Sequence, residues 1–437
     1  MKYYQYETNE NVDKIPYDKE PILRQTSYKK QKSSPVASSK ALVLVVCFLV
    51  VMNVILGGLI VSFLSNSKND QINNTTINLT APAGEGIDVS AVASKAKLSV
   101  VSIHCGVEKS GSALAYAEFY NEPESMGSGV IFKMDKTNSI AYISTCYHVV
   151  QNQKNIYVLL YDSFKPIQAK LIHYSSVYDI AVLEISLDTD SENAGEIKVS
   201  SAREAEVADS AYLLEGDGVV AIGNPLGAGI SVTRGIVSKT VEIVKIDGFE
   251  RRVLRTDTAI NGGNSGGGLF NLQGQLIGIV NAKAIDNPYK DSYIDNVAYA
   301  IPSNVAISLA NNILRNKTPL KAVIGVGLMT ESSGVKLDVV QGTYIPTQKV
   351  IVSTIDENIV KPGTFKVSDQ IESFSYGNTV VNVINTYSFD DYSFDLSKGE
   401  QVTFTVIRTN PDTGKQERVT FTITISQTVP ADKQQWY

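Results

Sequence analysis

The segment Thr258–Phe270 places one serine among glycines, a pattern suited to nucleophilic chemistry. It reads TAINGGNSGGGLF, so Ser265 is flanked by glycines on both sides of a short turn. Glycines around a hydroxyl allow a sharp turn and a close approach of the backbone to a ligand. They also leave successive N–H groups free to converge on one point, as a site that stabilises an oxyanion requires. Taken alone, however, a glycine-rich turn between two strands is the better interpretation.

The same serine also satisfies the G-x-S-x-G pattern of the α/β-hydrolase nucleophile elbow. In that fold the chain order is serine, acid, histidine. The three histidines of the chain, His104, His148 and His173, all precede Ser265. The elbow is therefore excluded, and the order that remains is histidine, aspartate, serine.

His148 and Asp179 supply the other two groups that a serine nucleophile needs. His148 follows a predicted strand in ISTCYHVV, and Asp179 opens another strand in YDIAVLEI. A serine hydroxyl becomes nucleophilic when a neutral imidazole accepts its proton and a buried carboxylate orients that imidazole. Singly, a core histidine and a turn aspartate are the simpler interpretations. Together with Ser265, they predict a catalytic triad carried on three separate loops.

The elements that must position these loops are predicted by short apolar runs between turn residues. The runs cover residues 98–104, 129–132, 140–143, 156–160, 180–185 and 219–222. Their spacing is typical of an all-β barrel or sandwich. Helices are predicted over Val89–Lys97 and Pro302–Arg315, the second with an apolar face at helical spacing.

Seven sequence blocks, in this order, resemble the protease domain of the HtrA/Deg serine proteases. They are GSGVIF at 127–132, the His148 and Asp179 blocks, AIGNPLG at 221–227, VTRGIVS at 232–238, TDTAINGGNSGG at 256–267 and VAYAIPS at 297–303. The resemblance implies a mainly β fold, with a chymotrypsin-like double β-barrel over residues 89–316.

The resemblance also implies roles for individual residues. His148 would be the general base, Asp179 the acid that orients it, and Ser265 the nucleophile. The backbone N–H groups of Gly263 and Ser265 would form the oxyanion hole, with no metal and no cofactor. His104 and His173 do not fall on the catalytic position of the family, so we expect both to be structural.

The sequence departs from the family just before the catalytic histidine. The family usually has small or amide side chains there, whereas this chain has Cys146 and Tyr147. These two residues either tune access to the imidazole or only fill space.

Residues 320–427 carry a second β pattern, which resembles the small PDZ-like α+β domain that follows the protease in this family. Ile324, Gly325 and Val326 resemble the loop that binds a peptide carboxylate, and a PDZ groove takes an extended chain end as an added strand. Ser368 stands where the family has a glycine before Asp369. A small β domain that only packs or oligomerises is the alternative, and residues 428–437 are predicted to be a tail.

The first 88 residues predict a membrane anchor. Residues 1–40 are polar and predict a disordered cytoplasmic tail. Residues 41–64 are apolar over a length that predicts one transmembrane helix, and residues 65–88 predict a flexible linker. Because lysines cluster before the apolar segment, the catalytic part is expected outside the cytoplasm. The predicted localisation is therefore a single-pass protein of the cell membrane, of bacterial source.

Composition excludes several other classes of protein. The formal net charge is -6 and there is no basic patch interleaved with aromatic residues, so nucleic acid is not an expected partner. Three cysteines are too few for a disulfide framework, and no ligand spacing indicates a metal site. Whether Cys105 and Cys146 pair with each other stays open.

The sequence thus predicts a serine endopeptidase that hydrolyses misfolded or envelope proteins through an acyl-enzyme on Ser265. Its expected partners are unfolded polypeptides, C-terminal peptide ligands at the PDZ-like domain, and the membrane. Family precedent suggests a homotrimer. Two alternatives stay open, a signalling protease with a narrow substrate that a bound peptide switches on, and a non-catalytic chaperone or scaffold that keeps the fold.

Overall fold

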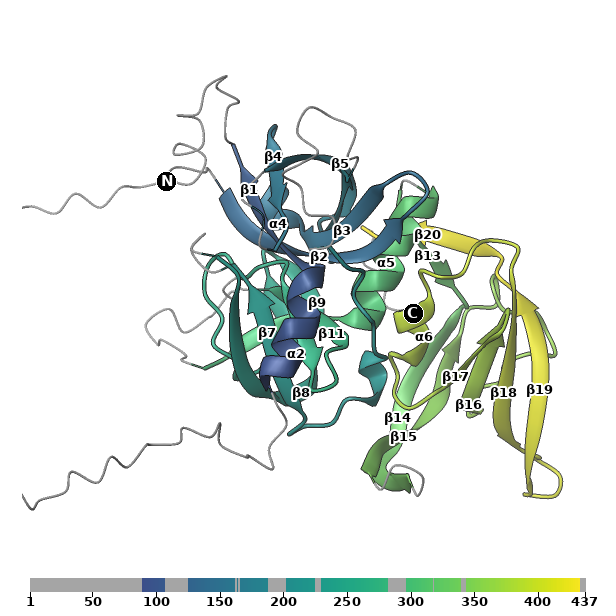
Figure 1. Ribbon diagram of the computed structural model, residues 1–437. Coiled ribbons are helices and arrows are strands. Elements are labelled where there is room, and N and C mark those ends of the chain that lie inside the picture. Colours follow the sequence, from purple (N-terminus) through teal and green to yellow (C-terminus); the bar gives the residue numbers. More distant parts are fainter. Residues whose placement is uncertain are drawn as a thin grey trace, which may run out of the picture. The chain divides into compact units, whose positions relative to one another are not determined.

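The computed structural model (Figure 1) describes most of the chain after residue 88. The described residues are 89–106, 125–161, 163, 166–187, 202–224, 229–281, 296–316, 318–338 and 343–432. All of them belong to one compact unit, Gly84–Tyr437. The predicted disordered tail 1–40, membrane helix 41–64 and linker 65–88 lie outside the described residues.

The localisation predicted from the sequence is corrected by the structure. Within the described part of the chain, no helix combines the length and the apolar character that crossing a membrane requires. The single-pass membrane localisation therefore finds no support.

Six antiparallel strands close into a first barrel, in the order β1-β2-β3-β6-β5-β4. Apolar side chains such as Ile103, Ile143 and Leu183 fill it and are fully buried. The turns at the strand ends carry the predicted catalytic histidine and aspartate. The strands are β1 (Val100–Cys105), β2 (Ser125–Asp135), β3 (Ile140–Cys146), β4 (Ile156–Leu159), β5 (Ile167–Ser175) and β6 (Ile180–Ser186).

A second closed barrel has the order β10-β11-β12-β9-β8-β7. The glycine-rich segment with Ser265 connects β9 to β10. The two closed barrels confirm the predicted chymotrypsin-like double β-barrel. The strands are β7 (Gly218–Gly223), β8 (Ser231–Ile246), β9 (Phe249–Thr256), β10 (Gly268–Asn271), β11 (Leu276–Asn281) and β12 (Ala298–Pro302).

Helices cover the barrels where the sequence predicts them. Helix α2 (Val89–Ala96) leads through the 3-10 turn η2 (Lys97–Ser99) into β1, and α5 (Ser303–Asn316) follows β12. Val305, Leu309 and Ile313 lie one helical turn apart on α5 and are buried against the barrel core. The remaining short helices of this part are α4 (Tyr147–Val150) and the 3-10 turn η5 (Ser210–Tyr212).

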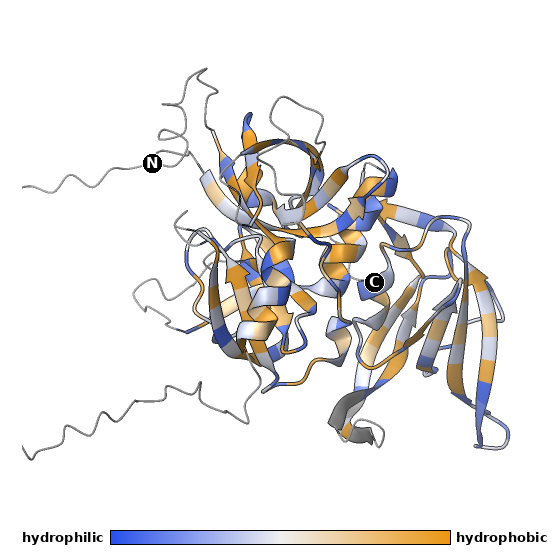
Figure 2. Cartoon of the chain, viewed as in Figure 1, coloured by the Kyte–Doolittle hydropathy of each residue, from blue (hydrophilic) through white to orange (hydrophobic). Residues whose placement is uncertain are grey.

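Residues 320–432, called the C-terminal part below, contain a six-stranded sheet with its own apolar core. Buried side chains alternate with partly exposed ones along most of β18, so one face of the sheet packs inward. Figure 2 shows hydrophobic and hydrophilic residues interspersed along the strands of this sheet. The elements are β14 (Val326–Asp338), β15 (Thr343–Ile355), β16 (Gln370–Tyr376), β17 (Thr379–Asn382), α6 (Ser388–Tyr392), β18 (Gln401–Thr409) and β19 (Gln416–Thr424).

The predicted tail differs from the structure. We expected residues 428–437 to be frayed, whereas Gln427–Pro430 form strand β20, antiparallel to β13 (Leu320–Val323). Ala431 is buried next to this strand and its N–H donates to the carbonyl of Pro319 at 2.9 Å. Strands β13 and β20 are far apart in the sequence, so their pairing depends on the tertiary fold and cannot be predicted from a local sequence pattern.

Candidate active site

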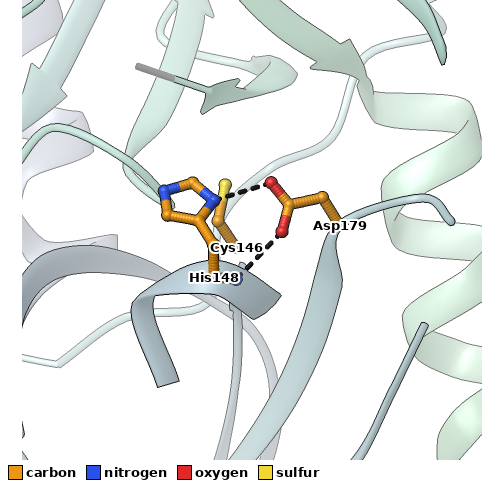
Figure 3. Close-up of side chains that lie close together, drawn as sticks. All are labelled: Cys146, His148 and Asp179. Atoms are coloured by element: carbon orange, nitrogen blue, oxygen red, sulfur yellow. Dashed lines mark hydrogen bonds and ion pairs between the residues drawn. The ribbon is translucent and has the colours of Figure 1, made fainter. Parts of the chain in front are cut away.

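His148 and Asp179 face each other across a short gap in the first barrel (Figure 3). The His148 Nδ1 and Asp179 Oδ2 atoms lie 2.7 Å apart, a strong hydrogen bond. The backbone N–H of His148 donates to the other carboxylate oxygen at 2.9 Å. His148 therefore makes two hydrogen bonds to the carboxylate of Asp179. The bond through Nδ1 determines that this imidazole nitrogen, and not Nε2, faces the acid.

The backbone presents Asp179 in an uncommon conformation. Asp179 lies in the turn between β5 and β6 and has φ = 55°, in the left-handed region. Aspartate tolerates this region better than most residues, yet the conformation persists only when its surroundings hold it. The carboxylate is thereby turned inward, and the residue is only 1% exposed.

A buried carboxylate needs compensation to stay charged. Burial alone would raise the pKa of Asp179, but the hydrogen bonds and charge of His148 and the charge of Arg251 hold that pKa below its ordinary value. The side-chain amide of Asn281, at the end of β11, donates to Asp179 Oδ2 at 2.9 Å. The acid is thus kept ionised and oriented, as a base-orienting group must be.

The thiol of Cys146 lies beside this pair (Figure 3). Cys146, His148 and Asp179 each offer a ligand atom within 4.8 Å of the others. A tetrahedral zinc ion would separate its nitrogen and oxygen ligands by roughly 3.3 Å, more than the 2.7 Å between Nδ1 and Oδ2. Cys146 Sγ instead donates to the Val280 carbonyl at 3.3 Å. The geometry fits a hydrogen-bonded acid–base pair better than a metal site.

Tyr147 makes two contacts that hold helix α4, which carries His148, in place. Its ring stacks on Tyr174 with centroids 3.9 Å apart, and its backbone N–H donates to the Asp179 carbonyl at 3.1 Å. Burial, together with the hydrogen bond to Tyr174, raises the pKa of Tyr147 to about 12, so its hydroxyl is protonated at neutral pH. Tyr147, which stands where the family usually has a small or amide side chain, thus connects helix α4, which carries His148, to the turn between β5 and β6 that presents Asp179, called the aspartate turn below.

Ser265 is packed against the end of the strand that leads to His148. A Cβ atom on the next residue, Gly266, would lie 2.1 Å from the Ser128 carbonyl oxygen and 2.3 Å from Thr145 Oγ1. Gly266 also has φ = 85°, so only glycine fits there. The structure thereby brings the serine loop, which connects β9 to β10 of the second barrel, against Ser128 and Thr145 of the first barrel.

Ser128 on β2 fixes the loop on both sides of Asn264. Its hydroxyl donates to the Gly263 carbonyl at 2.7 Å and accepts from the Asn224 N–H at 2.8 Å. Its backbone N–H donates to the Ser265 carbonyl at 2.8 Å. Because both carbonyls are held, the loop has one orientation, with Gly263 at φ = 93°. Such fixed peptides are what a preorganised oxyanion hole needs.

The other predicted residues lie elsewhere. His104 is buried on β1, and His173 on β5 packs edge-on against Tyr174. Cys105 and Cys146 remain thiols rather than forming a disulfide. Three residues resemble a carboxylate-binding loop: Ile324 and Gly325 lie in the turn between β13 and β14, and Val326 is the first residue of β14. Ile324 and Val326 belong to the C-terminal core, and Gly325 has φ = 75°.

Two contributors to the site were missed by sequence reasoning, Asn281 and Ser128. Asn281 carried one signal in the sequence, because it is an amide that directly follows the apolar run Leu276–Val280. Ser128 carried none beyond its place in the block GSGVIF, since its partners are backbone groups more than 90 residues away.

Comparison with known proteins gives the same domain. Residues 127–279 match the trypsin-like peptidase domain, a range that contains His148, Asp179 and Ser265. The chain is 30% identical to the serine protease Do-like HtrA of Lactococcus lactis subsp. cremoris, over 61% of this chain and 65% of the relative. It is 38% identical to the serine protease Do-like HtrB of Bacillus subtilis, over 47% and 42%.

A third relative is the periplasmic pH-dependent serine endoprotease DegQ of Escherichia coli, 35% identical over 51% of this chain and 45% of the relative. A solved structure of an HtrA-type protease with a tripeptide covers 78% of this chain and 98% of its own, with 22% identity and a TM-score of 0.44. The chain thus spans less than two thirds of each of the three curated relatives. The chain thus contains a trypsin-like peptidase domain and is similar to serine proteases of the HtrA/Deg family.

Proposed function

We propose that the chain is a serine endopeptidase that hydrolyses peptide bonds of unfolded polypeptides, with residues 89–316 as its protease domain. In this proposal Ser265 is the nucleophile, His148 the general base and Asp179 the acid that orients it. The observation that carries the proposal is the 2.7 Å hydrogen bond between His148 Nδ1 and Asp179 Oδ2. It holds the imidazole so that Nε2 faces away from the acid and is the nitrogen left to act on a serine.

Acylation begins when His148 Nε2 takes the proton of Ser265 Oγ as that oxygen attacks the scissile carbonyl carbon. The charge that develops on the carbonyl oxygen is stabilised by the N–H groups of Gly263 and Ser265. The imidazolium is stabilised by the buried carboxylate of Asp179. Collapse of the tetrahedral intermediate breaks the C–N bond, and His148 gives its proton to the leaving amine.

Deacylation repeats these steps with water. His148 takes a proton from the water as its oxygen attacks the acyl carbon, and the same two N–H groups stabilise the second oxyanion. Breaking the ester bond returns the proton from His148 to Ser265 Oγ. The products are a new carboxylate end and a regenerated triad.

The test uses the full chain with fluorescently labelled unfolded casein and with a fluorophosphonate that labels activated serines. Wild type is compared with Ser265→Ala and with Ser144→Ala, which removes a buried hydroxyl of β3 outside the site. We expect cleavage and labelling by wild type and Ser144→Ala, and neither by Ser265→Ala. Cleavage that survives Ser265→Ala would refute the proposal, and a folded wild type inert toward both reagents would favour the scaffold.

A peptide-gated protease is the second candidate function, and one feature of the C-terminal part favours it. Strand β14 forms an edge of the six-stranded sheet, and the turn at Gly325 opens directly into it. An edge strand is a template on which an extended peptide adds. Labelling that rises when a peptide with a free C-terminal carboxylate is added, but not with its amidated form, would support gating.

A further inference from the structure

The turn that presents Asp179 is contacted from the C-terminal part of the chain. The Ser175 hydroxyl, at the start of this turn, donates to Asp432 Oδ1 at 2.7 Å and accepts from the Tyr178 N–H at 3.4 Å. The Tyr178 ring packs edge-on against Phe394, with centroids 5.2 Å apart. Tyr178 directly precedes Asp179, so these contacts act one residue from the acid.

Phe394 belongs to the core of the protease rather than to that of the C-terminal sheet. It is 1% exposed and packs in the same apolar cluster as the strands of the first barrel, together with Ala431. Its carbonyl accepts from Asn312 Nδ2 at 2.6 Å and from Arg315 Nη2 at 2.8 Å, both on α5. The Phe394 ring is therefore held in place where it contacts the ring of Tyr178.

Buried charges add a second attachment. Lys321 on β13 pairs with Asp390 on α6 at 2.7 Å and hydrogen-bonds the Tyr178 side chain. Burial alone would lower the pKa of Lys321, but the Asp390 carboxylate raises it, so the lysine is charged. Burial raises the pKa of Tyr178, so its hydroxyl is protonated. A buried ion pair of this kind tolerates little displacement of either partner.

Strand β9 of the second barrel contacts both the turn that presents Asp179 and helix α6. Arg251 donates from Nε to the Val177 carbonyl at 2.7 Å and from Nη2 to the Ser176 carbonyl at 2.8 Å. Its neighbour Arg252 forms an ion pair with Asp391 of α6. Because neighbouring residues of a strand point to opposite faces, β9 joins the aspartate turn on one face to α6 on the other.

From these contacts we infer that the C-terminal part is a positioning element for the catalytic acid, acting through Phe394 and the Lys321–Asp390 pair on Tyr178. The left-handed backbone of Asp179 needs surroundings that hold it, and these residues supply them. The inference rests on the proposed function. It assigns Tyr178, Lys321 and Asp390 as positioning residues, and none of them touches the substrate.

The test compares full-chain variants that remove this attachment with a matched control. The double substitution Lys321→Met with Asp390→Leu removes both charges and keeps the volume. Tyr178→Phe removes only the hydroxyl and keeps the ring on Phe394, which guards against a double variant that does not fold. The control is Arg418→Gln with Glu372→Gln, which breaks the exposed 2.6 Å ion pair between β19 and β16.

Two readouts are used, kcat and the downfield proton NMR signal of the Nδ1–H between His148 and Asp179. A misplacement of about 1 Å in a catalytic group costs up to roughly 100-fold, so we expect kcat to fall about 10- to 100-fold in the double variant and less in Tyr178→Phe. The KM should change little, and the Nδ1–H signal should weaken or move upfield. The control should keep wild-type kcat and the wild-type signal.

Folded Lys321→Met/Asp390→Leu and Tyr178→Phe variants with wild-type kcat and an unchanged Nδ1–H signal would overturn the inference. So would equal losses in the control, because they would show a general effect on folding. The NMR signal does not depend on turnover. A wild type that shows the signal but no Ser265-dependent cleavage would therefore refute the proposed function and leave the positioning contacts to be judged by the signal alone.

Discussion

The amide of Asn281 donates to the same carboxylate oxygen of Asp179 that faces the imidazole, at 2.9 Å. The carboxylate is thus held from the second barrel as well as from the first. Because these two hydrogen-bond partners lie on different barrels, the orientation of the carboxylate depends on how the two barrels pack against each other.

Replacing Asn281 by aspartate should therefore damage the site more than replacing it by alanine. Asn281→Ala removes one donor, and we expect kcat to fall about 10-fold, the loss of one hydrogen bond to a charged group. Asn281→Asp places a second carboxylate against Asp179, and like charges at this distance do not both ionise, so kcat at pH 7 should fall further. Steady-state kinetics on a peptide substrate measure both, with Asn410→Asp in the exposed β18–β19 turn as control. Equal activity of the two variants would contradict the expectation.

Removing the hydroxyl of Ser128 should impair catalysis without removing any triad residue. Ser128→Ala frees the Gly263 carbonyl and the Asn224 N–H from their shared partner. The oxyanion peptides then lose their fixed orientation, and removing one such interaction costs about 100-fold in kcat. We expect a decrease of roughly 10- to 100-fold in kcat with little change in KM. Ser144→Ala is the matched control, and a Ser128→Ala variant as fast as this control would show that the hydroxyl is dispensable.

Gly266→Ala tests close packing at the serine loop separately from backbone strain. Its Cβ would lie 2.1 Å from the Ser128 carbonyl oxygen, whereas a Cβ on Gly248, with a similar φ of 81°, meets nothing within 4 Å. Gly248→Ala should lower the free energy of unfolding by about 1 kcal/mol from backbone strain alone. Gly266→Ala should lower it by several kcal/mol more and abolish fluorophosphonate labelling. Urea unfolding midpoints compare the two, and equal shifts would argue against the tight fit.

The lowered pKa of Asp179 predicts how stability depends on pH. A carboxyl whose pKa is lower in the folded state contributes stability that is present above its unfolded value of about 3.9. That contribution is lost as the pH falls through the folded value. The difference in unfolding free energy between wild type and Asp179→Asn should therefore shrink as the pH drops below about 4.

Asp395 provides the opposite case for the same measurement. Burial raises the pKa of Asp395, so its contribution is largest at low pH and declines as the pH rises through the raised value. Relative to Asp395→Asn, the stability of wild type should therefore fall with rising pH. Urea unfolding at a series of pH values gives both slopes, and slopes of the same sign would show that one of the two assignments is wrong.

The sequence predicted the parts of the protease that follow from local pattern. The apolar runs located β1, β2, β3, β4 and β6 of the first barrel and β7 of the second. The order of His148, Asp179 and Ser265 along the chain excluded the hydrolase elbow. The hydrogen bond between the first two follows the predicted geometry. Their roles in catalysis stay a prediction until the kinetic tests above are made.

What the sequence did not predict depends on contacts between distant residues. Asn281 ends a strand pattern, and only the folded barrels bring it to Asp179, 102 residues away. Phe394 looks like one more apolar residue of the C-terminal part, and only its burial in the first cluster reveals its place beside Tyr178. Ser368, recognised as a departure from glycine, adopts φ = 74°, so the backbone keeps a glycine-like conformation although the residue has changed.

The bond between Ser175 and Asp432 joins residues 257 positions apart, and β20 pairs with β13 just before Asp432. A nascent chain emerges from the ribosome in sequence order and folds as its parts become available. The triad residues have all been translated by residue 265, but the bond that secures the aspartate turn forms only once the chain has been made as far as Asp432. If the C-terminal part positions the aspartate turn as we propose, a chain made only as far as residue 316 would carry all three proposed triad residues without the contact that secures this turn.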